Sequence, residues 1–305
     1  MILVVCPNPS VDSYVFLKRI KPGKVNRVEK EIFYPGGKGV HVAIGLQELG
    51  EKTTLLGFWA GPTGKWLQVE LEKLGVSWRG PEVKGWSRIC QTFKTEDEFD
   101  ESEMLGVGPA LFDEDYALFI KSYKSLLPEI SLVVMSGSWP KGAPENGYKE
   151  LVELAHELAI PVVVDATGVQ MKNALKAHPD LIHLNFEEAK EITGKQTIDE
   201  ILKDLKKQTG SVALTDGKEG LYLLQKDRII HGKVLLDRII SAVGSGDSLT
   251  AGLAYGLKNG YSQEELTKLG VACGAANCLR RELGLFYKKD VEDLLKKVTV
   301  NTLSI

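Results

Sequence analysis

The feature that most constrains the fold is an alternation of short apolar segments with helical patterns in the middle of the chain. Residues 132–136, 161–165 and 181–184 are near-continuous apolar runs, and helical periodicity fills the intervals between them. Strands that are apolar on both faces are typical of a parallel sheet covered by helices on each side. The alternation therefore predicts an α/β fold with a doubly wound, mostly parallel sheet.

The rest of the chain extends this pattern. We expect further strands at 2–6, 53–58 and 211–214, a hairpin at 221–240, and helices at 39–49, 63–74, 114–127, 145–159, 169–177, 186–193, 197–208, 247–258, 262–280 and 290–297. Neither a repeat nor a low-complexity linker divides the 305 residues. We therefore expect a single domain spanning 1–305.

Two insertions depart from the alternation of helix and strand. Residues 13–34 and 87–106 alternate polar and apolar side chains, and both lie between strand-helix units. We expect them to pair into one small β-sheet, called the lid below. Val15, Leu17, Ile32 and Tyr34 would give the lid an exposed apolar face. Proteins usually cover such a face and its strand edges, so we expect a homodimer that pairs two lids.

Composition narrows the classes of partner. The net charge is −3 and no basic tract stands out, which argues against nucleic acid or a membrane surface. The four cysteines form no Cys-x-x-Cys pair, and no histidine cluster has metal-ligand spacing, so neither a disulfide framework nor a zinc site is indicated. With no signal-peptide pattern and no apolar run near 18 residues, the sequence predicts a cytoplasmic protein.

A glycine turn late in the chain suggests chemistry on phosphate. Residues 241–248 follow an apolar, strand-like segment, Val234–Ile240, and lead into a helical pattern. Gly244 and Gly246 let backbone N–H groups gather at a helix N-terminus, where an anion is favoured. Asp247 beside that anion could accept a proton from an alcohol that attacks phosphorus. The alternative is a simple turn with Asp247 complementing the helix dipole.

A second glycine turn, Pro35-Gly-Gly-Lys-Gly39, opens a helix near the start of the chain. Neither turn fits the common nucleotide motifs. None of the Gly-Lys pairs is followed by Ser or Thr, which excludes the Walker pattern, and residue 249 is Leu where a dinucleotide fingerprint needs its third glycine.

Together the two turns, about 200 residues apart, resemble both signatures of the ribokinase-like PfkB family of sugar kinases. The resemblance covers essentially the whole chain and implies ATP-dependent phosphorylation of a sugar. By that resemblance, Asp247 is the catalytic base, and Gly244, Ser245 and Gly246 form the anion hole for the transferred phosphoryl group.

The resemblance also assigns a nucleotide and metal site. Asn185 and Glu188 match the family's Asn-x-x-Glu, in which Glu188 would act on Mg²⁺ through water. Thr215, Gly217 and Gly220 match the loop that closes over ATP, and Asn277 would lie near adenine. For Asn185 and Glu188 the alternative is a helix N-cap with Glu at N3, a capping box.

Within the family, the chain looks most like the phosphosugar branch, which includes 1-phosphofructokinases and tagatose-6-phosphate kinases. Its cations for a sugar phosphate would be Lys24, Arg27 and Arg88, whose alternative is ordinary solvated charge. The remaining implied sugar-site residues are Asp12, Gly36, Gly37, Lys38, Gly39, His41, Ser136 and Ser138.

The resemblance implies fructose 1-phosphate as substrate, converted to fructose 1,6-bisphosphate. Tagatose 6-phosphate and fructose 6-phosphate are the near alternatives. A plain sugar or nucleoside kinase and a non-catalytic sugar-phosphate sensor are more distant ones.

Four positions depart from the family pattern. Ser241 replaces an Asp of many ribokinases, which favours the phosphosugar branch. His41 replaces an Asn that contacts sugar hydroxyls, while Cys90 and Trp139 replace other common residues. We expect these last three on the sugar side of the site, where they leave the preferred sugar open.

Overall fold

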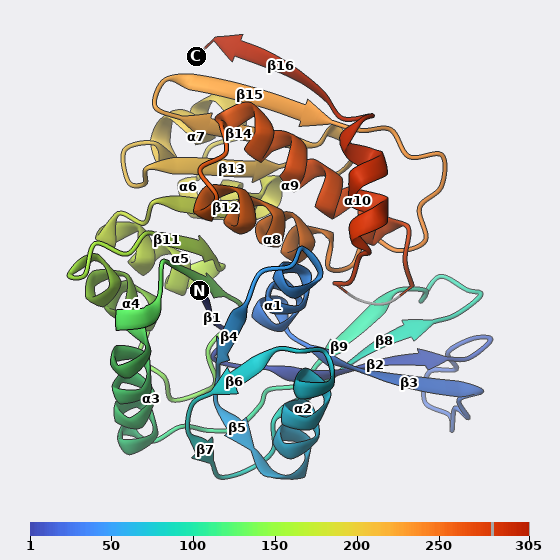
Figure 1. The fold of residues 1–305 in the computed structure, drawn as a ribbon. Coiled ribbons are helices and arrows are strands. Elements are labelled where there is room, and N and C mark those ends of the chain that lie inside the picture. Colours follow the sequence, from blue (N-terminus) through green and yellow to red (C-terminus); the bar gives the residue numbers. More distant parts are fainter. Residues whose placement is uncertain (282–283, 305) are drawn as a thin grey trace.

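A ten-stranded sheet forms the centre of the computed structural model, which describes residues 1–281 and 284–304 (Figure 1). Within those residues the strand order is β16-β15-β14-β13-β12-β11-β10-β1-β4-β6. The strands are β1 (Ile2–Val5), β4 (Thr53–Leu56), β6 (Ser77–Arg79), β10 (Leu132–Ser136), β11 (Val162–Asp165), β12 (Leu181–Asn185), β13 (Ser211–Thr215), β14 (Leu221–Gln225), β15 (Arg228–Lys233) and β16 (Thr299–Ser304).

The sheet is parallel from β6 through β13, and β14, β15 and β16 extend it antiparallel. In register, Val4 of β1 lies between Leu55 of β4 and Val134 of β10, and all three are fully buried. Apolar side chains on both faces of these strands explain the two helical layers.

Each face of the sheet has its own hydrophobic core, covered by helices that alternate with the strands. One core includes α1 (Lys38–Glu48), α2 (Gly61–Lys73), α8 (Ser245–Lys258), α9 (Gln263–Cys278) and α10 (Lys288–Leu295). The other includes α3 (Asp113–Leu126), α4 (Gly147–His156), α5 (Gly168–Ala174), α6 (Phe186–Thr193) and α7 (Ile198–Leu205). The predicted doubly wound α/β class is confirmed. In the described ranges, no helix is both long and apolar enough to cross a bilayer.

The strand order reverses between β1 and β10. From β1 the chain adds β4 and β6 on one side, and from β10 onward it adds strands on the other. In open α/β sheets, ligands bind at the carboxyl ends of strands where the order reverses. Residues that follow β1 and β10 are therefore positioned to line a site.

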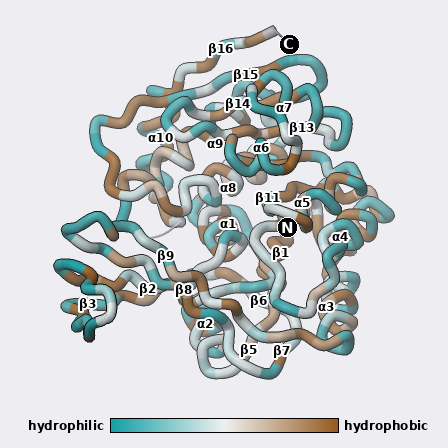
Figure 2. The backbone as a smooth tube through the Cα atoms, turned by 180° about the vertical axis from the view of Figure 1, so that it is seen from behind, coloured by the Kyte–Doolittle hydropathy of each residue, from teal (hydrophilic) through white to brown (hydrophobic). Residues whose placement is uncertain are grey.

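The lid is a four-stranded sheet in the order β3-β2-β8-β9, built from both insertions as predicted. Its strands are β2 (Ser10–Phe16), β3 (Lys30–Gly36), β8 (Arg88–Lys94) and β9 (Ser102–Leu105). The lid projects from the body at the lower right of Figure 1 and at the lower left of Figure 2, which shows the reverse view.

The register corrects the predicted apolar face of the lid. Tyr14 pairs with Ile32, and Val15 pairs with Glu31. Directly paired side chains point to the same face of a sheet and neighbours along a strand to opposite faces. Val15 therefore lies on the face opposite Ile32, and the four residues expected to share a face do not.

Several local predictions were wrong. Val234–Ile240 is not a strand. β15 ends at Lys233, and both of its edges are already paired, one with β14 and the other with β16. The hairpin accordingly ends at 233. The sequence analysis also missed β6, β16 and the two-residue pair β5 (Trp59–Ala60) and β7 (Glu82–Val83). Short edge strands carry too few residues to show a period.

Candidate active site

Asp247 lies in the first turn of α8, where the predicted glycine turn is found. Gly244 is the N-cap of the helix and has φ of 80°, and a Cβ there would come within 2.4 Å of the Gly284 nitrogen. Glycine is therefore required at 244 both by conformation and by space. The Asp247 side chain is buried, although a carboxylate normally seeks water.

The partner of Asp247 is His41, on the second predicted glycine turn at the start of α1. His41 Nδ1 lies 2.8 Å from Asp247 Oδ2, and its Nε2 lies 3.4 Å from Asp12 Oδ2. The second contact is close enough for attraction but is not a well-aligned hydrogen bond, since His41 Nε2 has no hydrogen-bond partner. One imidazole thus stands between two buried carboxylates.

These groups shift one another's pKa values. Burial acts to lower the pKa of His41, but its contacts with Asp12 and Asp247 outweigh this and raise it to about 10. Burial raises the pKa of Asp247, and His41 offsets part of that rise. Burial acts to raise the pKa of Asp12, but the close contact with His41 and the hydrogen bond from Ser10 hold it below the ordinary value.

Asp12 reaches this cluster from β2 of the lid. The Ser10 hydroxyl donates to Asp12 Oδ1 at 2.6 Å. A Cβ at Gly36 would come within 2.0 Å of the Asp12 carboxyl carbon, so Gly36 leaves the space that this carboxylate occupies. Cys90, which we expect on the sugar side, pairs in register with Asp12 and lies on the same face of the lid.

Of the three predicted lid cations, only Arg88 is near the cluster. Arg88 pairs in register with Ser10, and its Nε donates to the Asn8 carbonyl at 3.0 Å. Lys24 and Arg27 lie in the exposed loop that joins the far ends of β2 and β3. Within a single subunit, Lys24 and Arg27 therefore lie apart from Arg88.

Beside this cluster a second network surrounds Lys38. Its Nζ lies 3.1 Å from Asp165 Oδ1 and 3.6 Å from Glu188 Oε1. Asp165 also contacts His183 Nδ1 at 3.1 Å and accepts a bond from the Thr250 hydroxyl at 2.9 Å. Burial acts to raise the pKa of Asp165, but Lys38 and His183 hold it well below its usual range.

Asp165 and His183 were missed by the sequence analysis. Asp165 is the last residue of β11, and His183 lies in β12 with its Nε2 3.2 Å from the predicted nucleotide residue Thr215. A carboxylate at the carboxyl end of a buried parallel strand was the available signal.

Asn185 and Glu188 form the capping box that was the structural alternative. The Asn185 side chain accepts from the Glu188 nitrogen at 2.9 Å, and Glu188 Oε2 accepts from the Asn185 nitrogen at 3.0 Å. Glu188 Oε1 points toward Lys38. The described residues contain no group of three or more His, Cys, Asp or Glu that could hold a metal. Kinases hold Mg²⁺ by one or two carboxylates together with phosphates and water, a donor set that Asp165 and Glu188 fit.

The small residues of the first glycine turn lie against the ends of β1 and β10. A Cβ at Gly39 would come within 2.5 Å of Cys6 Cβ and 3.0 Å of the Ser136 carbonyl oxygen. Gly37 is the N-cap of α1, with φ of 96°. The buried Ser136 hydroxyl has no hydrogen-bond partner, and Ser138 is exposed. These residues lie at the carboxyl ends of β1 and β10, where the strand order reverses.

Other predicted positions have visible structural roles. Asn277 is buried, and its amide donates to the Val243 carbonyl at 2.9 Å, which braces the turn before α8. Gly220 has φ of 92°, and a Cβ there would come within 2.2 Å of the Gly232 carbonyl oxygen. Gly217 has open space around it.

Trp139, which we expect near the sugar, packs edge-on against Phe119 and Tyr148.

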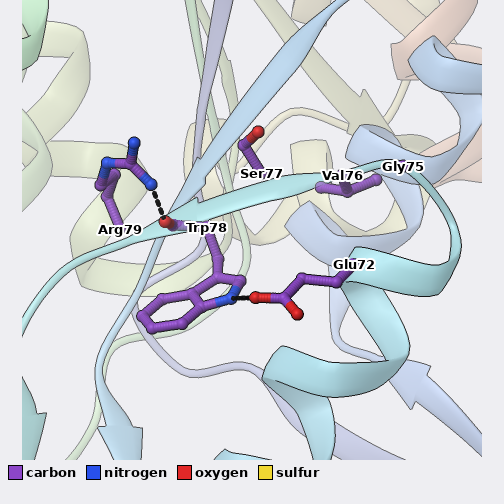
Figure 3. Close-up of a pocket in the computed structure, with 6 residues that line it drawn as sticks. All are labelled: Glu72, Gly75, Val76, Ser77, Trp78 and Arg79. Atoms are coloured by element: carbon purple, nitrogen blue, oxygen red, sulfur yellow. Dashed lines mark hydrogen bonds between the residues drawn. The ribbon is translucent and has the colours of Figure 1, made fainter.

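A surface hollow of about 290 Å³ lies away from these residues. It is formed at the edge strand β6, where Trp78 Nε1 donates to Glu72 and Arg79 donates to the Trp78 carbonyl (Figure 3). The residues that line it are Glu72, Gly75, Val76, Ser77, Trp78 and Arg79. It contains none of the predicted site residues.

The comparisons with known proteins agree with this geometry. Residues 8–289 match the model of the pfkB family of carbohydrate kinases. A 1-phosphofructokinase of Bacillus subtilis is 32% identical over 309 residues, covering 99% of this chain and 100% of that protein.

Two solved structures share the fold. Phosphofructokinase-2 of Escherichia coli, in complex with fructose-6-phosphate, has a TM-score of 0.86 at 24% identity and covers 97% of this chain and 98% of its own. Arabidopsis thaliana ribokinase, complexed with ribose and ATP, has a TM-score of 0.77 at 20% identity, with 96% and 98% covered.

The ribokinase-like fold, the family match and the Bacillus subtilis relative define the class as a sugar kinase, a phosphotransferase. The chain belongs to the pfkB family of carbohydrate kinases.

Proposed function

We propose that this kinase phosphorylates the C6 hydroxyl of fructose 1-phosphate to give fructose 1,6-bisphosphate. The observation that carries the proposal is the placement of Asp247, buried in the first turn of α8 and joined through His41 to Asp12 of the lid. Asp247 would act as the base, and Asp12, on the other side of the His41 ring, would bind a sugar hydroxyl. The Bacillus subtilis relative, a 1-phosphofructokinase, supports fructose 1-phosphate as the first substrate to test.

In the proposed reaction, Asp247 accepts the proton of the sugar hydroxyl as its oxygen attacks the γ-phosphorus of ATP. The bond from that phosphorus to the bridging oxygen breaks, and ADP leaves with the electron pair. The N–H groups of Ser245 and Gly246 at the start of α8 would stabilise the charge on the transferred group. Lys38, whose charge acts on Asp247, would supply a cation.

Mg²⁺, when bound, would neutralise charge on the phosphates of ATP. Glu188 and Asp165 would hold it directly or through water. Thr215, Gly217 and Gly220 would contact the nucleotide.

Arg88 would bind the phosphate of the sugar, because it is oriented by Asn8 and lies at the Asp12 end of the lid. A guanidinium binds phosphate through two parallel hydrogen bonds, which a plain sugar cannot use.

We also propose a homodimer through the lids. Phe33, Ile89 and Met104 are 49%, 42% and 62% exposed. The register places all three on the lid face opposite Asp12. A second copy on this face would bury them. Lys24 and Arg27 are apart from Arg88 in one subunit. A phosphate site that includes all three would therefore need residues from a second copy.

A substrate panel tests the proposed function. Purified protein is assayed for ADP release with fructose 1-phosphate, fructose 6-phosphate, tagatose 6-phosphate, fructose and ribose. We expect the highest kcat/KM with fructose 1-phosphate. A preference for fructose 6-phosphate, the ligand of the Escherichia coli neighbour, would replace the proposed substrate. No turnover with any of the five would favour a sensor.

A further inference from the structure

The most unusual group near the site is His41, a histidine enclosed between two carboxylates. His41, Asp12 and Asp247 are 4%, 7% and 6% exposed. Gly284 closes the cluster from the loop before α10, because a Cβ there would come within 2.1 Å of the His41 ring. All three groups are therefore largely shielded from water.

Burying two carboxylates together is costly unless a cation accompanies them. The imidazole ring is the group in direct contact with both. Other charges act from neighbouring elements: Lys38 on α1 and Asp165 on β11 act on Asp247, and Arg88 on β8 acts on Asp12. Glu103 on β9 interacts electrostatically with Asp12, Asp247 and His41. Cys6, just after β1, interacts in the same way with Arg88 and Asp247. None of these other groups forms a contact with both carboxylates.

We propose that His41 is a positioning residue that remains an imidazolium ion and ties the base Asp247 to the sugar-binding Asp12. The inference rests on the proposed function, in which Asp247 takes the proton of the sugar hydroxyl. Nδ1–H fixes the direction of the Asp247 carboxylate. Nε2–H faces Asp12 without an aligned bond and is the donor that adjusts when a hydroxyl enters.

The charge has a defined consequence for the pH dependence of the reaction. A cation within hydrogen-bond distance lowers the pKa of a carboxyl group by roughly 1–3 units. His41 therefore keeps Asp247 ionised, and able to act as a base, at pH values where burial alone would protonate it. Without the charge on His41, Asp247 should become protonated at a higher pH, so that activity is lost earlier as the pH is lowered.

The first measurement follows the histidine itself. Imidazole nitrogen and carbon chemical shifts are recorded by NMR from pH 5 to pH 10 in the full-length protein, and the His41 signals are assigned by their loss in His41→Asn. We expect His41 to stay protonated through neutral pH, in line with its pKa of about 10, and to titrate at lower pH in Asp247→Asn. Titration of wild-type His41 near pH 6.5, the usual value, would overturn the proposal.

The second measurement is the pH profile of kcat/KM, which reports the ionisation of the free enzyme. Asparagine can keep a hydrogen bond near the Nδ1 position, and glutamine near Nε2, but neither carries charge. In His41→Asn and His41→Gln we expect the acid limb to move up by about 1–3 pH units. His156→Asn is the matched control, since His156 contacts Asp180 on the surface, outside the site, and should leave the profile unchanged.

A uniform loss of rate at every pH, with the acid limb in place, would show a packing role and overturn the proposal. If no sugar phosphate is turned over, the proposed function fails instead. The NMR titration then decides the state of His41 without any activity.

Discussion

At the scale of single residues, Glu188 illustrates how one side chain can satisfy two explanations. Its Oε2 closes the capping box of α6, while its Oε1 faces Lys38 and the proposed metal site. The sequence alone supported both readings, since Asn-x-x-Glu is both a helix start and a family motif. Geometry shows the first, and only a measurement can show the second.

Glu188→Gln separates the two roles. Glutamine also serves at the N3 position of a capping box, so thermal stability should change little. The Mg²⁺ concentration for half-maximal activity should rise by roughly 10–100-fold, because an outer carboxylate that orients metal-bound groups is lost. Glu187→Gln, an exposed neighbour paired with Lys190, is the control. An unchanged Mg²⁺ titration would contradict the metal role.

His41, Asp165 and His183 show the limit of reading residues in sequence. Asp12, His41 and Asp247 come from β2, α1 and α8, and their contact depends on long-range packing. Asp247 and His41 could be picked out because each adjoins a glycine turn. Asp165 ends an apolar strand and His183 lies inside one, and neither adjoins a glycine turn, so they were overlooked.

At the scale of elements, the buried strands were predictable and the edges were not. β1, β10, β11 and β12 are apolar on both faces, which fixes their identity. β6 and β16 pair on one side only, and their short sequences carry little periodicity. The faces of the lid depend on register, which a one-residue shift reverses. For that reason the existence of the lid was predicted correctly, while its apolar face was not.

The corrected lid face gives a prediction about assembly. Phe33→Glu and Met104→Glu place charge on the face opposite Asp12, where we expect two copies to meet. Analytical ultracentrifugation at micromolar concentration should show a dimer for the wild-type protein and a monomer for each variant. Leu158→Glu, which alters a residue of similar exposure beyond α4, should remain dimeric. A monomeric wild-type protein would remove the dimer proposal.

At the scale of the whole molecule, the two glycine turns meet although about 200 residues separate them. The parallel sheet aligns the carboxyl ends of its strands, and α1 and α8 then start from the same side of it. Alternation of helix and strand predicted this arrangement, because a doubly wound sheet has one ligand-binding edge. The class of reaction followed from the two turns together. The identity of the sugar did not, because we expect it to depend on side chains such as His41 and Arg88, whose surroundings form only in the folded protein.

The most direct test of the account is Asp247→Asn, measured for ATP binding by calorimetry and for turnover by ADP release. Asparagine keeps the size of the side chain and loses the base. We expect ATP affinity close to that of the wild-type protein and turnover lower by roughly 10²–10⁴-fold, the usual contribution of general-base catalysis. Turnover that survives the substitution, or a loss that is matched by lost ATP affinity, would contradict the assignment of Asp247 as the base.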